Sequence, residues 1–187
     1  MNLPFGEPLD PIVILGEHVT LRTWSAIDLP AVREAAADDF LRSMTSLPDV
    51  VDDTEYQAFI ERQDHRLASG EGWALAICTD PEAPALGHIG IWTGAVRKGQ
   101  VELGYWVVPS ARRRGLMQDA LRAATDWAFA NLEIHRANLF IEPANEASAR
   151  TAEAAGYERE ALLARWQTVG GEPRDMYCYR RLLDITP

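Results

Sequence analysis

Residues 107–121 read Val107-Val108-Pro109-Ser110-Ala111-Arg112-Arg113-Arg114-Gly115-Leu116-Met117-Gln118-Asp119-Ala120-Leu121. An apolar strand pattern over residues 103–108 runs into three arginines and a glycine, and an amphipathic helix pattern follows. The first turn of a helix has backbone N–H groups without intrahelical partners and a partial positive charge, so it favours anions. Gly115 lets a phosphate approach the backbone, and arginines offer forked donors that match its oxygens. The segment predicts a phosphate-binding loop; the alternative is a solvated basic turn with an ordinary glycine.

The composition is that of an ordinary globular protein. The chain has 187 residues, 47% hydrophobic and 25% charged, which fits one domain with a proper core. We expect an N-terminal arm over residues 1–17 and a single domain over residues 18–187. A formal net charge of -10 argues against a general basic face for nucleic acid. Because no apolar run reaches the ~20 residues of a membrane span and no signal-peptide pattern is seen, we expect a cytoplasmic protein without a membrane partner.

The sequence contains two cysteines, Cys78 and Cys178. Each lies in an apolar or aromatic strand pattern, and they are too far apart in sequence to suggest a disulfide framework or a zinc site. We expect two buried, reduced thiols and no metal.

Residue periodicity predicts a mixed α/β (α+β) chain. Asp28 is placed to cap a first helix, and Asn145 to cap a short helix that ends at Gly156. A Gly170-Gly171 turn joins the last two strands as a hairpin. We expect residues 40–53 to form a loop. The expected strands are residues 12–15, 18–24, 73–79, 86–93, 101–108, 136–142, 157–169 and 173–183, and the expected helices are residues 28–38, 54–68, 113–131 and 145–156.

The chain resembles the GCN5-related N-acetyltransferases (GNAT), and within them the ribosomal-protein-type (RimJ/RimL-like) branch. The family's phosphate motif, Gln/Arg-x-x-Gly-x-Gly/Ala, corresponds to residues 112–117, where Met117 replaces the usual small residue. Glu102-Leu103-Gly104-Tyr105-Trp106 resembles the strand before that motif in the branch. Asn145-Glu146-Ala147-Ser148 and Ala154-Ala155-Gly156-Tyr157 resemble its Asn-x-x-Ser helix and Gly-aromatic exit. The order of elements fits from about residue 18 to residue 184.

The resemblance implies a GNAT-type, mostly antiparallel twisted sheet of about seven strands, with helices on both faces. It also implies a splay between two central strands, here residues 101–108 and 136–142, that holds acetyl-CoA as co-substrate. Asn145 would contact the pantetheine or the thioester. The backbone of Trp106, Val107 and Val108 would pair with the pantetheine, and the amides of Arg112, Arg113, Arg114, Gly115, Leu116, Met117 and Gln118 would hold the pyrophosphate.

The implied reaction is attack of an amine on a thioester, which calls for a base, an oxyanion donor and an acid. Glu102 is the first candidate base; the alternative is a solvent-facing glutamate. His88 is the second candidate base, with a structural role as its alternative, and a water relay stays open. The amide of Val107 or Val108 would serve as the oxyanion donor.

Ser148 is the candidate acid. Many relatives carry a tyrosine seven residues after the asparagine, but this chain has Ala152 there. The alternative for Ser148 is local support of the first helical turn. Trp166 and Asp175, on the last hairpin, are placed to line an acceptor cleft or to serve the fold, and Tyr157 is expected in the core.

The acceptor stays open between a protein N-terminal amine and a small-molecule amine of the aminoglycoside type. A second class of function is a catalytically silent module that binds CoA. A P-loop nucleotide site is excluded because the sequence has no Gly-x-x-x-x-Gly-Lys-Ser/Thr. A homodimer is compatible with the sequence, which leaves the oligomeric state undecided.

Overall fold

The computed structural model describes residues 7–48 and 52–184. The strands are β1 (Ile14–Leu15), β2 (Thr20–Thr23), β3 (Gly72–Cys78), β4 (Gly87–Trp92), β5 (Gln100–Val107), β6 (Arg136–Ile141), β7 (Glu158–Val169) and β8 (Glu172–Leu182). The helices are α1 (Leu29–Ala36), α2 (Asp39–Met44), α3 (Asp53–Ala68), α4 (Leu116–Asn131) and α5 (Glu146–Ala154).

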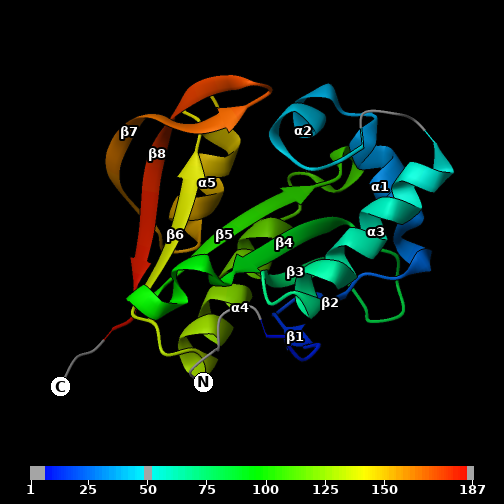
Figure 1. Ribbon diagram of the computed structural model, residues 1–187, viewed down its shortest axis with the longest axis horizontal. Helices are drawn as coiled ribbons and strands as arrows, with labels where there is room; N and C mark the ends of the chain where they lie inside the picture. The colour runs from blue at the N-terminus through cyan, green and yellow to red at the C-terminus, as the bar shows by residue number, and fades with distance from the viewer. Residues whose placement is uncertain (1–6, 49–51, 185–187) are drawn as a thin grey trace.

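The strands form one open sheet in the order β1-β2-β3-β4-β5-β6-β8-β7. The central pair, β5 and β6, is parallel, and every other neighbouring pair is antiparallel. Helices α1 and α3 cover one face, with α2 beside them, and α4 and α5 cover the other (Figure 1). The predicted mixed, mostly antiparallel sheet with helices on both faces is confirmed.

The sheet has eight strands rather than about seven, because part of the expected arm joins it. Ile14 and Leu15 pair with Leu21 and Thr20 of β2. Before β1, the carbonyl of Asp10 accepts a hydrogen bond from the indole N–H of Trp73 at 2.9 Å. Residues 1–6 of the expected arm and 185–187 of the expected domain lie outside the described residues.

The expectation of a loop over residues 40–53 is wrong for its first part, where α2 forms. Asp38 caps this helix by accepting a hydrogen bond from the Leu41 amide at 3.1 Å, and Leu41 is the residue that α2 buries. Six residues are too few to show a helical period, so the pattern does not reveal α2. Residues 49–51 of the expected loop lie outside the described residues.

Asp28 begins α1, but its side chain does not cap that helix. The carboxylate is fully buried and pairs with the Arg22 guanidinium at 2.8 and 2.9 Å. It also accepts hydrogen bonds from the amides of Ser25 and Ala85. The expected capping bond is therefore corrected: Asp28 ties β2 to the loop before β4.

The splay between the central strands is present. Pairing of β5 with β6 ends at Glu102 and Asn138, although β5 continues to Val107 and β6 to Ile141. The backbone edge of β5 beyond Glu102 therefore has no β6 partner. This opening is where the two central strands part in Figure 1.

Side chains alternate along β5, so its two faces carry different residues. Trp106 lies opposite His88 of β4, and both contact Phe59 of α3, which places them on the α3 face. Glu102, an even number of residues away, shares that face. Tyr105 points to the other face, where it contacts Ser148 of α5.

Both cysteines are buried free thiols, as predicted, and burial raises the pKa of Cys78 to about 11. Tyr157 is buried in the core, where its hydroxyl lies 2.6 Å from that of Thr125. In the part of the chain that the structure describes, no helix has the length and apolar character needed to cross a membrane.

Candidate active site

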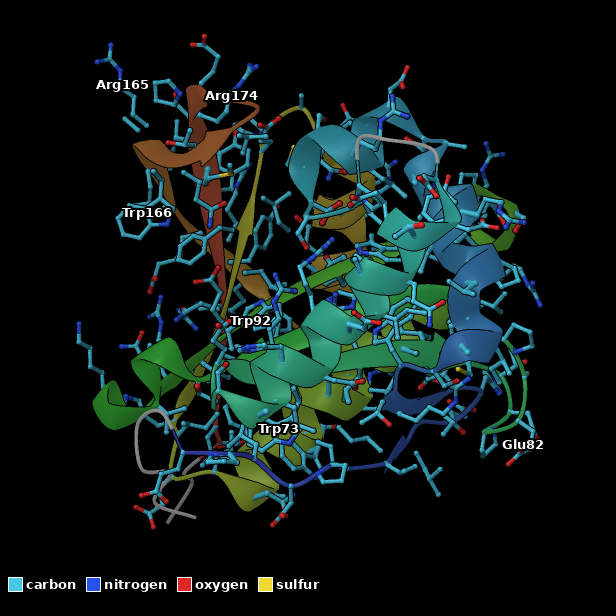
Figure 2. All side chains as sticks on the ribbon, turned by 45° about the vertical axis from the view of Figure 1, so that its right-hand side comes forward. Trp73, Glu82, Trp92, Arg165, Trp166 and Arg174 are labelled. Atoms are coloured by element: carbon cyan, nitrogen blue, oxygen red, sulfur yellow. The ribbon has the colours of Figure 1, made fainter. Side chains whose placement is uncertain are left out.

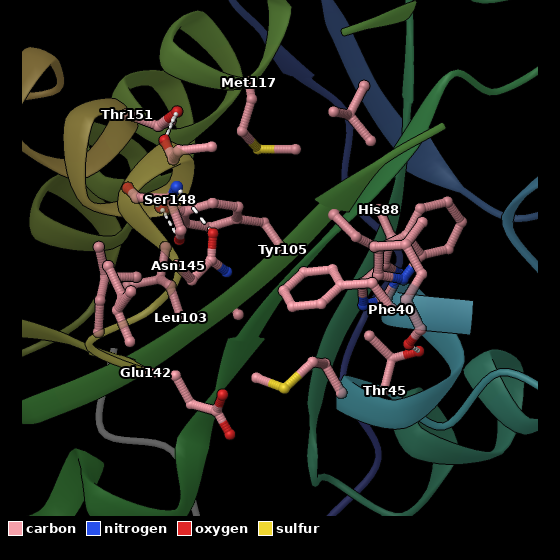
Figure 3. A pocket seen from close by; sticks show the side chains of 18 of the residues that line it. Phe40, Thr45, His88, Leu103, Tyr105, Met117, Glu142, Asn145, Ser148 and Thr151 are labelled. Carbon is pink, nitrogen blue, oxygen red and sulfur yellow. Dashed lines mark hydrogen bonds between the residues drawn. The ribbon is translucent and has the colours of Figure 1, made fainter. Parts of the chain in front are cut away.

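A cleft of about 1230 Å³ runs along the splay. One half is formed by the loop before α4, the end of β5 and the first turn of α5, and we name it the donor half. The other is formed by α2, parts of α3 and β4, and the hairpin of β7 and β8, and we name it the acceptor half. In Figure 3, Asn145 and Ser148 lie on one side of the cleft, and His88 and Phe40 on the other.

The donor half contains the loop that the sequence singled out. Helix α4 begins at Leu116, not near Arg113, because Arg113 and Gly115 adopt left-handed backbone angles, with φ of 61° and 76°. The Asp119 amide donates to the Gly115 carbonyl at 3.2 Å. The amides of Leu116, Met117 and Gln118 come before that bond, so they have no intrahelical acceptor.

Met117 occupies the position where the family motif has a small residue, yet it does not fill the loop. Its side chain is buried in the hydrophobic core. A Cβ added to Gly115 would meet no atom within 4 Å, so the backbone here is open to a ligand. The loop fits an anion through its amides.

The three arginines do not play equal parts. Arg112 Nη2 lies 2.5 Å from Asp38 Oδ2. Arg113 and Arg114 are exposed, and within the described residues no carboxylate pairs with either of them. Glu34 holds the same loop from α1 by accepting hydrogen bonds from the amide and hydroxyl of Ser110 at 2.7 and 2.9 Å. Arg112 therefore braces the loop, and Arg113 and Arg114 are its free cations.

The free edge of β5 differs from the expected one. The amide of Val108 donates to the Leu86 carbonyl at 3.0 Å, so it is not available to a ligand or an oxyanion in the splay. Because backbone groups alternate in an antiparallel ladder, those of Trp106 also point to β4. The same alternation directs the backbone of Tyr105 and Val107 into the splay. Of the three expected pairing residues, only Val107 keeps that backbone role.

Glu102 lies at the residue pair where the splay begins. Its side chain is partly buried in the cleft, and burial raises the pKa of its carboxyl group. It stands opposite Trp92 in the β4 pairing. Among the described residues, no cation forms an ion pair with it.

His88 also lines the cleft, but its surroundings suit a neutral ring. It stacks on Trp106 with centroids 5.8 Å apart and planes 17° apart, beside Trp24. Burial, assisted by the charge of Arg66, lowers the pKa of His88 to about 3. Its Nδ1 is buried and has no hydrogen-bond partner among the described residues. These surroundings favour the structural alternative for His88.

Ser148 stands in the first turn of α5, across the splay from Glu102. Asn145 caps the helix, and its Oδ1 accepts from the Ser148 amide at 3.1 Å. The Ser148 hydroxyl donates to the Tyr105 hydroxyl at 3.0 Å, and Tyr105 donates to the Ser148 carbonyl at 3.1 Å. The sequence analysis did not identify the contact of Tyr105 with Ser148. The alternation of side chains along β5, which puts Tyr105 on the α5 face, is the signal that could have revealed it.

The acceptor half has one wall, α2, that the sequence did not predict, and a hairpin wall formed by other residues than the expected ones. Phe40, Met44 and Thr45 of α2 line it, as do residues 167–170 of the hairpin. Trp166 is not among the lining residues. Its side chain is 52% exposed and packs on Phe140, with the ring centroids 5.4 Å apart. Figure 2 shows it projecting from the hairpin together with Arg165 and Arg174. Asp175 accepts from the Arg165 amide at 2.8 Å, which gives it a local structural role.

The comparison with known families agrees with this geometry. A family model described as acetyltransferase (GNAT) domain matches residues 18–158. The chain belongs to the GNAT acetyltransferase family. Among curated proteins, the "Probable N-acetyltransferase YjcK" of Bacillus subtilis (strain 168) is 26% identical over 121 residues. That match covers 63% of this chain and 62% of YjcK, so the chain spans less than two thirds of this relative.

Solved GNAT structures share the fold. RimL, a ribosomal L7/L12 alpha-N-protein acetyltransferase in complex with coenzyme A, superposes with a TM-score of 0.78 at 18% identity, covering 94% of this chain and 100% of that one. RimJ of Mycobacterium smegmatis, in complex with CoA-disulfide, gives 0.76 at 22% identity, covering 100% and 92%. These neighbours confirm the fold expected of the RimJ/RimL-like branch. Family and named relatives together support an acetyltransferase.

No group of three or more His, Cys, Asp or Glu side chains is arranged as metal ligands in residues 7–48 and 52–184. Charged side chains of both signs line the cleft. Arg113 and Arg114 belong to the donor half, whereas Glu102 lies where the acceptor half begins and Arg66 of α3 lines that half as well. The arginines of the donor half suit an anionic ligand there.

Proposed function

We propose that this GNAT protein is an acetyl-CoA-dependent N-acetyltransferase that moves acetyl to a primary amine by direct attack on the thioester. The observation that carries the proposal is the free edge of β5 between Glu102 on one face and Ser148 on the other. A thioester in that opening has a base on the side of the acceptor half and an acid on the side of α5.

The donor half accounts for the choice of acetyl-CoA. The amides of Leu116, Met117 and Gln118 at the start of α4, with Arg113 and Arg114, match a pyrophosphate. Pantetheine amides would pair with the free backbone of Tyr105 and Val107. The side-chain amide of Asn145 lines the cleft at the end of this path. Solved neighbours contain coenzyme A or its disulfide, which agrees with this reading.

Glu102 would take the proton from the attacking amine. Alkyl amines have pKa values near ~10.4, so most of the acceptor is protonated at neutral pH and a base is needed. A carboxyl group whose pKa is raised by burial is a better base at neutral pH than an exposed one. The amide of Val107, directed into the splay, is placed to donate to the oxyanion.

Ser148 would protonate the departing thiolate from the opposite face. Its helix is fixed by the Asn145 cap, so its hydroxyl has a defined place beside the splay. The forming C–N bond and the breaking C–S bond are then served by groups on opposite sides of the sheet. This separation keeps the base and the acid from neutralising each other.

A protein N-terminal amine is our first candidate acceptor. It is supported by the acceptor half, which is an open groove between α2 and the hairpin, and by the similarity of the fold to RimL, a ribosomal L7/L12 alpha-N-protein acetyltransferase. A small cationic amine of the aminoglycoside type is the second candidate. Glu102 and Glu142 both line the cleft, and in the described residues neither carboxylate forms an ion pair, so both are available to a positive acceptor beside Arg66, which also lines the cleft.

The proposal is tested by the release of free thiol from acetyl-CoA in the presence of peptides with free N-termini, aminoglycosides and polyamines. N-terminally blocked copies of the same peptides serve as controls. We expect release with at least one free amine and none with its blocked copy. Tight CoA binding without release for any acceptor would favour a silent CoA-binding module instead.

A further inference from the structure

Tyr105 is a cleft residue whose hydroxyl touches the proposed acid. It projects from the free edge of β5 toward the first turn of α5, and Figure 3 shows it beside Ser148 and Asn145. Its oxygen lies 3.0 Å from the Ser148 hydroxyl and 3.1 Å from the Ser148 carbonyl. Together with the Asn145 cap, these contacts hold Ser148 at its amide, its carbonyl and its hydroxyl.

A serine that gives a proton to a thiolate needs a source that replaces this proton. An alkyl hydroxyl is a much weaker acid than a phenol, so an unsupported serine would end the step as a strongly basic alkoxide. Tyr105 is a phenol in direct contact with that hydroxyl. We propose that Tyr105 supplies, through Ser148, the proton that the departing thiolate takes up, an inference that rests on the proposed function.

The proposed transfer conserves atoms and charge. As the C–N bond forms and the C–S bond breaks, Glu102 takes the proton of the amine nitrogen, and the sulfur takes the proton of the Ser148 hydroxyl. Ser148 takes the phenolic proton of Tyr105 across the 3.0 Å contact. The negative charge ends on the Tyr105 oxygen; solvent in the open cleft returns a proton to it, and Glu102 releases to solvent the proton taken from the amine. Hydroxyl groups rotate, so either oxygen can be the donor in this pair.

The surroundings of Tyr105 keep the proton in place between turnovers. Burial raises the pKa of Tyr105 to about 12, against a smaller opposing effect of the hydrogen bond with Ser148. The phenol is therefore neutral and keeps its proton at physiological pH. Tyr105 thus brings a protonated phenol from β5 to the first turn of α5.

The test compares Tyr105→Phe, Ser148→Ala and the double variant with the wild type. A matched control is Tyr157→Phe, which removes another buried phenolic hydroxyl, one bonded to Thr125 away from the cleft. We expect Tyr105→Phe to lower kcat by a factor on the order of 10², the lower end of the range for general acid catalysis, and to leave KM for acetyl-CoA within about twofold. The double variant should lose little beyond Ser148→Ala, because the two residues act in one path.

A proton inventory of kcat in mixtures of H₂O and D₂O distinguishes a proton relay through Tyr105 from a purely structural role of this residue. We expect a curved inventory for the wild type, from more than one proton in flight, and a straight one for Tyr105→Phe. If Tyr105→Phe has the same kcat as the wild type, or if the wild type gives a straight inventory, the inference is overturned and the proposed function stays intact. No thiol release with any acceptor would overturn both. If Tyr105→Phe fails to fold, the wild-type inventory alone decides.

Discussion

Arg112 and Asp38 join the two halves of the cleft, with Arg112 Nη2 2.5 Å from Asp38 Oδ2. Arg112 belongs to the loop before α4, and Asp38 is the cap of α2, whose residues form a wall of the acceptor half. Although burial alone would raise it, hydrogen bonds from the Leu41 amide and Arg112 lower the pKa of Asp38. The carboxylate therefore stays charged and couples the donor loop to the acceptor wall.

Replacing Asp38 by Ala should loosen both halves at once. The lost helix cap alone removes about 1 kcal/mol of stability, and Arg112 loses its anchor. We expect a lower midpoint in denaturant unfolding and higher KM values for both acetyl-CoA and acceptor. Asp39→Ala is the control, because Asp39 is 91% exposed and pairs only with nearby Arg42. Equal effects of the two substitutions would show that the link between Arg112 and Asp38 does not matter.

Gly115→Trp should block CoA binding without unfolding the protein. Gly115 has a left-handed φ and open space around it, so a large side chain would fit the fold but occupy the place of the phosphate. Gly171→Trp is a matched control, since Gly171 also has a left-handed φ (82°) and open surroundings, and it does not line the cleft.

Both tryptophan variants carry the backbone strain of a left-handed residue, roughly 1–2 kcal/mol. Only Gly115→Trp should weaken CoA binding, by about a hundredfold or ~3 kcal/mol. Isothermal titration calorimetry measures the difference. Unchanged affinity in Gly115→Trp would remove the loop as the pyrophosphate site.

Glu102→Gln should lower kcat by a factor on the order of 10² to 10⁴ while leaving CoA affinity unchanged. The base acts when deprotonated, so wild-type kcat/KM should fall as the pH drops through the raised pKa of Glu102. That acid limb should be absent from whatever activity remains in Glu102→Gln. Steady-state kinetics from pH 5 to pH 8 supply the comparison, and near-normal turnover would exclude Glu102 as the base.

His88 should make folding stability depend on pH. Its pKa is about 3 in the folded protein, against 6.5 for the unperturbed group. The unfolded chain therefore binds the proton more tightly, and the contribution of neutral His88 is present above pH 6.5 and is lost progressively as the pH falls toward 3.

Denaturant unfolding at pH 7 and pH 5 should show a smaller decrease for His88→Gln than for the wild type. His65→Gln, at an exposed position of α3, is the control and should behave like the wild type. All titrating groups other than His88 and His65 are common to the three proteins, so the difference between the two variants isolates His88. Equal pH dependence in all three proteins would contradict a buried neutral imidazole.

The sequence predicts the strand, loop and helix cap that form the donor half because their signals are local. The arginine-glycine loop, the apolar strand before it and the Asn145 cap each depend on residues within one turn or strand. The splay and the paired sheet follow from the family resemblance rather than from any spacing. The burial of both cysteines is also predicted correctly because each lies in an apolar or aromatic strand pattern, and that of Tyr157 because it directly follows the glycine after α5.

The features that the sequence does not reveal depend on partners distant in the chain. The sequence suggests Asp28 as a helix cap, but its carboxylate accepts hydrogen bonds from the Arg22 guanidinium and the Ala85 amide instead. The sequence does not show that the amide of Val108 is hydrogen-bonded to the carbonyl of Leu86. Tyr105 gains a role only when α5 is packed against β5, and α2 is too short for a periodic pattern. In the first three cases a tertiary contact overrides the local rule.

The central claim is transfer of acetyl from acetyl-CoA to a primary amine, and mass analysis of the acceptor tests it most directly. The enzyme is incubated with acetyl-CoA labelled in its acetyl group and with the amine that gives thiol release. We predict one labelled acetyl on the amine nitrogen per thiol released, with a sharp loss of product in Glu102→Gln. Thiol release without any labelled amine, or binding of CoA with neither product, would contradict the account.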